Sequence, residues 1–409
     1  MKRLPLEGVH VVDLSMMWAG PFATHLLGEM GAEVIKVESP RAWDNVRTLF
    51  PIPGPEPWNA SFYFNDYNRE KKSLTLDLAQ PRGRELLLAL VAKSDAVVEN
   101  YRADVLDKLG LGYAQLRQAR PDVILVSMAG FGKTGADREL VGFGPIVEQM
   151  AGLASLTGYG DDGVPYKTGI SYGDPVGGIA AASALVLALI RRRRTGEGAW
   201  IDLAQRETMA QMLPEAFVAA SLRGEEPVHR GNRHPTWAPQ GVYPSEGKEQ
   251  WLALSVRSDA EWRALCEVIG APELASLALE ARRARHDELD ERIAAWSSAR
   301  DGAVAQEALQ ARGIAAARML DSDSIHWDPH LLAREFWDFM PHPRMATIPQ
   351  PAPAWRLVEA NPRPRRPAPL FGEHNREILC GLLGVAEAEL TELAAAGVIG
   401  DVPMGAGVG

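Results

Sequence analysis

Residues 9–14 read VHVVDL and residues 32–37 read AEVIKV, and a helical pattern over residues 21–30 separates them. The helical segment opens with proline and is followed by Gly31, which is the usual order at the two ends of a helix. The same alternation continues to about residue 205, with further strands expected at 73–77, 96–99 and 123–127. This rhythm predicts an α/β fold with a mostly parallel sheet and helices on its faces.

The composition is that of an ordinary globular protein, with 46% hydrophobic and 23% charged residues over 409 positions. The net charge of −10 argues against nonspecific binding of nucleic acid. Cys266 and Cys380 are the two cysteines, too few for a disulfide framework or a cysteine-based metal site, so we expect no metal and a cytoplasmic location. The longest apolar run, residues 179–190, is shorter than the roughly 20 residues of a membrane span, so we expect no membrane association.

The pattern changes beyond residue 205. Residues 225–325 combine a strand at 250–256 with helical patterns rich in Ala, Glu and Arg, which predicts a second, smaller α+β domain. Residues 341–369 are rich in proline and are expected to form an extended connector. The whole chain of 409 residues is long enough for about two to three domains.

Residues 169–173 read GISYG and match G-x-S-x-G, the nucleophile elbow of α/β-hydrolases. That elbow requires an apolar strand before the serine and a helix after it. A helical pattern follows, but residues 164–168 are short and contain proline. A hydrolase that uses Ser171 is therefore kept as a remote alternative.

Asp174 follows this motif directly and precedes Pro175. Since proline is favoured in the first turn of a helix, we expect Asp174 at the N-cap of the apolar helix over residues 177–194, where the helix dipole would keep it ionised. Helix capping alone is one interpretation of this aspartate. The other is a nucleophile, because glycines clear the space on both sides of the carboxylate. These glycines are Gly169, Gly173, Gly177 and Gly178.

A series of short motifs, none specific alone, gives the chain a family resemblance through their order and spacing. The chain resembles the family III CoA-transferases, a group that includes formyl-CoA transferases, crotonobetainyl-CoA transferases and α-methylacyl-CoA racemases. The motifs are LEGVHVVDL (6–14), AGP (19–21), GAEVIKVE (31–38), NREKKSLTLD (68–77), VENY (98–101), LDKLG (106–110), the stretch around Asp174, RTGEG (194–198), GN (231–232) and PLFGEH (369–374).

The resemblance implies a large Rossmann-like domain built from both chain ends, a smaller domain between them, and two ring-like chains that interlock into a dimer. A homodimer is expected, and a heteromer with a related chain is the alternative. The implied division is a large domain over 1–205, a linker over 206–224, the small domain over 225–325, a return linker over 326–368 and the C-terminal part of the large domain over 369–409.

The resemblance also implies the chemistry. Asp174 matches the catalytic aspartate, which attacks an acyl-CoA thioester to give a mixed anhydride and CoA thiolate. An enzyme-CoA thioester follows, and CoA passes to a free carboxylic acid. The partners implied are thus an acyl-CoA and a free acid. Coenzyme A thioester is the substrate, and no permanently bound cofactor is expected, because thioesters and anhydrides are both activated acyl groups.

Residues expected to contact CoA follow from matching positions in the family. The family often has a basic residue at the position of Ser39, and here Arg41 stands two residues further on. Taken singly, Lys71, Lys72 and Lys108 are typical of solvated surface charges. The expected CoA-binding residues are Trp18, Ala19, Arg41, Leu76, Asn100, Tyr101, Arg102 and Lys108.

The racemase branch uses a histidine and an aspartate as two bases, and its histidine position falls on Phe143. Phenylalanine cannot move a proton, which disfavours racemisation. Transferases carry an aromatic residue nearby, so Phe143 is expected to contact the substrate, but the acid that follows it in transferases is missing here. The loop at residues 229–237 predicts an acid substrate larger than formate or oxalate, such as a dicarboxylate or aromatic acid, held by Arg230 or Arg233. The alternative is a solvated basic loop.

Overall fold

The computed structural model describes residues 3–160, 163–224 and 229–405, and it forms two compact units. The larger unit comprises Met1–Leu153, Lys167–Leu222 and Leu332–Gly409, and the second comprises Ala154–Tyr166 and Arg223–Leu331. The expected start of the small domain at residue 225 lies outside the described residues. The segment 154–166, assigned to the large domain by sequence, belongs to the second unit, because it folds on itself through Tyr166 N–H to Thr157 O at 2.8 Å and approaches Gly231 through Gly160.

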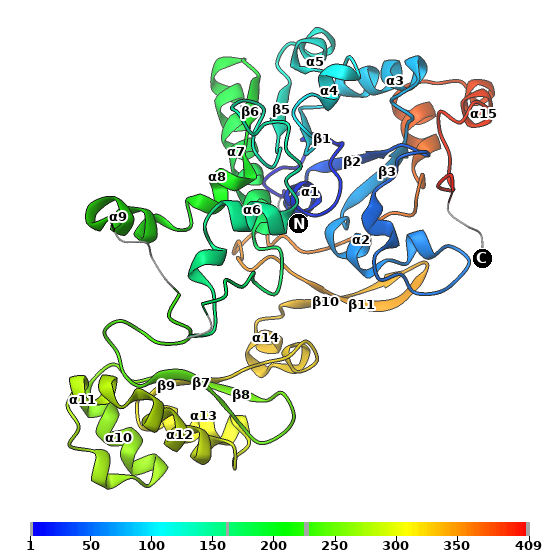
Figure 1. Cartoon of the computed structure of the whole chain (residues 1–409). Helices are drawn as coiled ribbons and strands as arrows, with labels where there is room; N and C mark the ends of the chain where they lie inside the picture. The colour runs from blue at the N-terminus through cyan, green and yellow to red at the C-terminus, as the bar shows by residue number, and fades with distance from the viewer. Residues whose placement is uncertain (1–2, 161–162, 225–228, 406–409) are drawn as a thin grey trace. The chain divides into compact units, whose positions relative to one another are not determined.

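The larger unit is built on a six-stranded sheet in the order β3-β2-β1-β4-β5-β6 (Figure 1). Every neighbouring pair is parallel, which confirms the predicted α/β class. The order is that of a Rossmann fold. The strands are β1 (His10–Asp13), β2 (Glu33–Glu38), β3 (Lys71–Thr75), β4 (Ala96–Glu99), β5 (Ile124–Ser127) and β6 (Ala199–Asp202).

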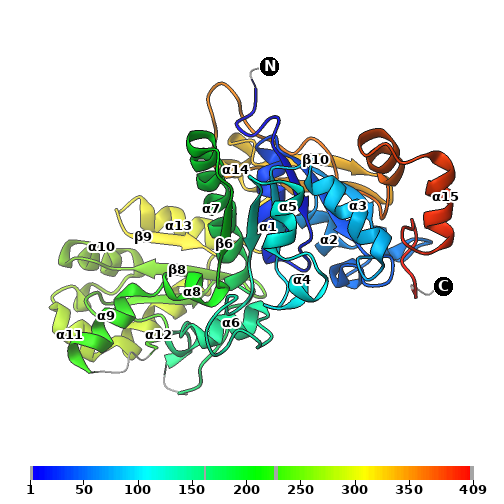
Figure 2. The ribbon, with the colours of Figure 1, turned by 90° about the horizontal axis from the view of Figure 1, so that it is seen from above.

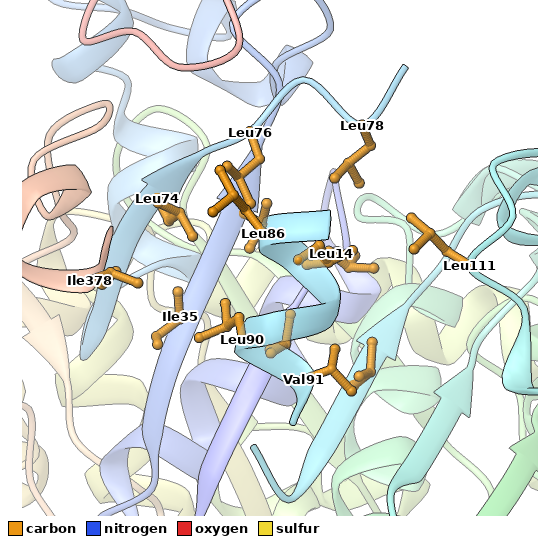
Figure 3. Close-up of a cluster of buried hydrophobic side chains, with 14 of the residues drawn as sticks. Leu14, Ile35, Leu74, Leu76, Leu78, Leu86, Leu90, Val91, Leu111 and Ile378 are labelled. Atoms are coloured by element: carbon orange, nitrogen blue, oxygen red, sulfur yellow. The ribbon is translucent and has the colours of Figure 1, made fainter. Parts of the chain in front are cut away.

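Both faces of this sheet are covered, because successive strand side chains point to opposite sides. Val12 and Ile35 face α3 (Pro81–Val91), whose Leu86, Leu90 and Val91 pack on them (Figure 3). The same cluster receives Ile378 from a π-helical turn (Glu377–Leu382), Leu393 from α15 (Glu387–Ala395) and Leu116 from α5 (Tyr113–Ala119). The C-terminal segment thereby completes the core of the larger unit.

The opposite face carries α1 (Ala19–Glu29) and α7 (Gly173–Thr195), which lie side by side (Figure 2). Ala23 and Leu27 of α1 and Leu185 of α7 share one buried cluster with the strands. The two helices are very close at Gly178, where an added Cβ would lie 2.8 Å from the Ala19 carbonyl oxygen and 2.8 Å from the Phe22 ring. Glycine is therefore required at this crossing.

The C-terminal segment also covers the open edge of β3. His374 N–H donates to Ser73 O at 3.0 Å, and Asp77 N–H donates to Val398 O at 2.7 Å. Asn375 accepts the Thr75 N–H at 2.8 Å. These bonds satisfy an edge that would otherwise be free to pair with another chain.

The second unit contains an antiparallel sheet in the order β7-β8-β9. Its core centres on Trp262 of α10 and is closed by α12 and α13. The elements are β7 (Gln240–Pro244), β8 (Trp251–Ser255), α10 (Asp259–Ile269), α11 (Leu279–Ala284), α12 (His286–Ser297), α13 (Gly302–Gln310) and β9 (Ala315–Arg318).

The proline-rich segment contains more structure than the extended connector that its composition predicts. β10 (Trp337–His342) and β11 (Met345–Pro351) form an antiparallel hairpin. A two-stranded ribbon has an unpaired side on each strand, so prolines such as Pro349 need not interrupt its ladder.

α7 differs from its expected form at its start. It begins at Gly173, and the residue before it, Tyr172, forms no side-chain cap. Asp174 thus lies inside the first turn, and the predicted N-cap role is wrong. By length and composition α7 could cross a membrane, a test that core helices of soluble proteins also pass.

We expect Gly178→Ala to destabilise the protein by about 1–3 kcal/mol, because the added methyl group overpacks the crossing of α1 and α7. Urea unfolding measures this change. Gly381→Ala is the matched control, since an added Cβ there meets nothing within 4 Å. An equal effect at both positions would show that the crossing is not tightly packed.

Candidate active site

The site begins where the strand order reverses, between β1 and β4. Ligands of open α/β sheets bind in the crevice at the carboxyl ends of such strands. Asn100, directly after β4, clamps the loop after β1: its Oδ1 accepts the Met16 N–H at 2.8 Å and its Nδ2 donates to Met16 O at 2.7 Å. The structure therefore joins the loop that leads to Trp18 and Ala19 to the loop that carries Asn100.

A network of buried charged residues stabilises the loops of this crevice. Lys71 Nζ lies 2.9 Å from Asp13 Oδ2, and Lys36 Nζ lies 2.9 Å from Asp44 Oδ2. Burial opposes ionisation of Asp13, but the charges of Lys71 and Lys36 lower its pKa to about 2. Lys71 is thus a buried structural cation, whereas its sequence context alone was typical of a solvated charge. Removing one member would leave an uncompensated buried charge.

Asp174 projects from the first turn of α7 to the start of α1. Its carboxylate accepts a hydrogen bond from the backbone of Ala19, which belongs to a different helix. Burial raises the pKa of Asp174, the Ala19 hydrogen bond lowers it and the negative charge of Glu148 raises it slightly, so that the pKa lies at about 7. The expected effect of the helix terminus, a firmly ionised carboxylate, is outweighed by desolvation. Neither the position nor the pKa is that of a simple helix cap.

Gly144 provides the space that this carboxylate occupies. It begins α6 (Gly144–Met150), and an added Cβ would lie 1.9 Å from Asp174 Oδ2 and 2.6 Å from Ser171 Cβ. Any other residue at position 144 would displace the aspartate.

An aromatic wall, which the sequence analysis missed, adjoins Asp174. Trp18 stacks on Tyr67 with ring centroids 5.2 Å apart and meets Tyr63 edge-on at 5.8 Å. Both tyrosines belong to α2 (Phe62–Tyr67). Burial, together with the charge of Asp174, raises the pKa of Tyr63 to about 12, so its hydroxyl keeps its proton at neutral pH. The aromatic run FYFNDY was the available signal for this wall.

The other expected CoA contacts have different surroundings. Leu76 is fully buried in the sheet core, so its side chain is not available to a ligand. Tyr101 packs against that core, whereas Arg102 is exposed. Lys108 is exposed and paired with Asp104. Arg41 is exposed, and its Nε lies 3.3 Å from Asp77 Oδ2. Its guanidinium is also next to Gly397 of the C-terminal segment.

The expected substrate residues lie in different units. Phe143 is half-exposed at the start of α6, next to Gly144. Arg233 belongs to the second unit, where its guanidinium pairs with Asp287 and lies 3.6 Å from Asp290. Its charge is thus already balanced within its own unit.

Ser171 lacks the structural context of a nucleophile elbow. Residues 163–172 are irregular, with a bend at 169–170 and a turn at 172, and they contain no strand. Ser171 instead contributes its carbonyl oxygen to Asp174 N–H at 3.1 Å. The motif therefore serves the turn that leads into Asp174.

Comparison with known proteins gives matches over nearly the whole chain. The model of CoA-transferase family III matches residues 6–375. Succinyl-CoA–D-citramalate CoA-transferase of Chloroflexus aurantiacus is 34% identical over 97% of this chain and 98% of its own length. Succinyl-CoA:mesaconate CoA-transferase of Haloarcula marismortui is 34% identical over 91% of this chain and 95% of its own. A solved CAIB/BAIF family protein from Brucella suis superposes with a TM-score of 0.86 at 30% identity, covering 93% of this chain and all of that one.

The protein is therefore an enzyme of the CoA-transferase class. The chain belongs to family III of the CoA-transferases. Enzymes of this class use CoA thioesters as substrates, and the predicted family and enzyme class are confirmed.

We expect Gly144→Ala to lower the transfer rate by about 100-fold or more, because the new methyl group must displace the Asp174 carboxylate by an ångström or more. Steady-state assays of CoA transfer measure this loss. Gly169→Ala, in the same glycine-rich stretch but with nothing within 4 Å of its added Cβ, is the control and should keep wild-type rates. Full activity of Gly144→Ala would contradict the close packing described above.

Proposed function

We propose that this enzyme transfers CoA from an acyl-CoA to a free carboxylic acid through covalent intermediates on Asp174. The observation that carries the proposal is the partly buried carboxylate of Asp174, with a pKa raised to about 7, beside an aromatic wall and a space kept open by Gly144. A desolvated, basic carboxylate is a better nucleophile than one in water.

In the first step a carboxylate oxygen of Asp174 attacks the thioester carbonyl carbon. The new C–O bond forms, the C–S bond breaks, and CoA leaves as the thiolate with the electron pair. The thiolate then attacks the aspartyl carbonyl of the mixed anhydride, which releases the donor acid and leaves CoA as a thioester on Asp174. The acceptor carboxylate attacks that thioester, and the released thiolate takes the acceptor acyl group and frees Asp174.

Residues around Asp174 have defined roles in this scheme. The Ala19 N–H holds the attacking carboxylate in one orientation. The protonated Tyr63 and the rings of Trp18 and Tyr67 exclude water, which would hydrolyse the anhydride. Trp18, Ala19 and Asn100 form the side of the crevice in which we propose that CoA binds, together with Arg41 and Lys108 for its phosphates. No permanently bound cofactor enters the scheme.

The acids are proposed to be dicarboxylic. Two relatives at 34% identity are named for succinyl-CoA with D-citramalate or mesaconate. A dicarboxylic acid also fits the expectation of a substrate larger than formate. Of the two arginines that the sequence suggests for a second carboxylate, Arg233 is paired with Asp287.

We further propose a dimer of two identical chains. The outer side of α7 is apolar and uncovered, with Ile179 and Leu187 exposed to 53% and 66%. Beside it lies a cavity of about 740 Å³ between α1, α7 and residues 351–355. The alternative, a heteromer with a related chain, predicts that this chain expressed alone stays monomeric.

Hydroxylamine trapping tests the nucleophile. We expect wild type incubated with succinyl-CoA and hydroxylamine to gain about 15 Da at Asp174, because hydroxylamine converts an activated aspartyl group into a hydroxamate. Intact-protein and peptide mass spectrometry measure the change, and Asp174→Asn should show none. A trapped adduct elsewhere, or exchange of the α-hydrogen of a 2-methylacyl-CoA with deuterated water without an acceptor acid, would refute the transferase mechanism.

The pH profile tests the state of Asp174. Since only the ionised carboxylate attacks, kcat/KM should rise with pH through a midpoint near 7 and be lost as pH falls below it. Initial rates between pH 5 and 9 with a pH-stable thioester measure this limb. A midpoint near 4, the ordinary value of an aspartate, would contradict the desolvation of Asp174.

A further inference from the structure

Glu148 is a second carboxylate at this site to which neither the sequence nor the comparisons assign a role. It lies in the second turn of α6 with its side chain fully buried, at 0% exposure. Its Oε1 accepts the Thr168 N–H at 2.8 Å. Within the described part of the chain, its Oε2 has no hydrogen-bond partner. A buried carboxylate oxygen without a partner destabilises the folded protein, which makes Glu148 a candidate functional residue.

The position of Glu148 ties it to the catalytic turn. Gly144, one turn earlier on α6, abuts Asp174 Oδ2. Val147 packs with Val176 of α7 and Met209 of α8 (Gln205–Ala210) in one small cluster. α6 therefore packs against the first turn of α7, so the charge of Glu148 acts on Asp174.

The hydrogen bond from Thr168 connects Glu148 to the loop that precedes Asp174. After the Thr168 N–H is held by Glu148, the Thr168 hydroxyl donates to Ile170 O at 2.5 Å and Tyr172 N–H donates to Ile170 O at 3.0 Å. Asp174 N–H then donates to Ser171 O. This short chain of bonds connects Glu148 to the backbone of Asp174.

The charges around Asp174 are few. α6 contributes Glu148, and α2 contributes the phenols of Tyr63 and Tyr67. α1 offers the Ala19 backbone, and α8 offers Gln205, an uncharged amide, against Gly177. Among these described neighbours Glu148 is the group that places a negative charge against the nucleophile.

We propose, on the basis of the function proposed above, that Glu148 is a positioning residue of the transfer reaction, which fixes the loop from Thr168 to Asp174 and sets a negative charge against the Asp174 carboxylate. Repulsion between two carboxylates raises the energy of free, ionised Asp174. It vanishes when Asp174 becomes a neutral anhydride or thioester. Glu148 thereby favours attack by Asp174 and its acylated forms.

Two substitutions separate the charge from the hydrogen bond. Glu148→Gln removes the charge but keeps an oxygen for the Thr168 N–H, whereas Glu148→Ala removes both. We expect Glu148→Gln to move the midpoint of kcat/KM about 1 pH unit lower, because loss of a like charge stabilises the ionised nucleophile. Its plateau rate should fall roughly threefold, because a less basic carboxylate attacks more slowly.

Glu148→Ala should show the same downward shift and a further rate loss of about tenfold, since the loop is no longer fixed. Glu207→Gln, an exposed carboxylate on α8, is the control and should leave midpoint and rate unchanged. Thermal unfolding of each variant confirms that it is folded before its rates are compared.

An unchanged or higher midpoint in folded Glu148→Gln would overturn the inference. Equal rates for the Gln and Ala variants would overturn the role of the Thr168 bond. Hydroxylamine trapping of wild type distinguishes these results from failure of the proposed function: if wild type traps at Asp174 and the Glu148 variants keep its pH profile, only the role of Glu148 fails. If wild type does not trap, the covalent mechanism fails instead.

Discussion

The crossing of α1 and α7 is the constraint on which the active site depends. Gly178 lets the two helices approach so closely that a Cβ would contact the Ala19 carbonyl oxygen. That approach brings the first turn of α7 to the start of α1, where the Ala19 backbone holds Asp174. A wider crossing would leave the aspartate solvated, with an ordinary pKa and lower nucleophilicity. The reactivity of one side chain is therefore set by the packing of two helices.

Asp13 and Asp174 are two carboxylates near the site whose charged surroundings differ. Asp13 is buried, and the charges of Lys71 and Lys36 keep its pKa near 2, so it remains a fixed structural anion. Asp174 is partly buried, none of the described salt bridges involves it, and its pKa rises to about 7. The first arrangement stabilises the loops of the crevice. In the proposed mechanism, the second raises the free energy of the ionised carboxylate, and acylation releases it.

The sequence predicted several features correctly because they depend on local pattern. The alternation of apolar runs predicted the parallel sheet, whereas the space beside the Asp174 carboxylate is provided by Gly144 and not by the four glycines that the sequence suggested. Prediction failed where distant segments meet. The N-cap assignment of Asp174 rested on Pro175 alone, while the helix begins at Gly173 because its first turn packs against α6 and α8. Glu148 carried no sequence signal of its own, since an isolated Glu is ordinarily a surface residue.

By itself, the amino-acid sequence determined the α/β class and the family to which the chain belongs, and it pointed to Asp174 as the candidate nucleophile, because these are encoded in periodicity and in ordered motifs. Only the tertiary structure decided how Asp174 ionises, that Lys71 is a buried structural cation and that Leu76 belongs to the core. The burial of a side chain and the charges near it depend on groups that are far apart in the chain. Glu148, for example, lies 26 positions before Asp174. These surroundings of Asp174 form only when α6, α7 and α1 are packed together.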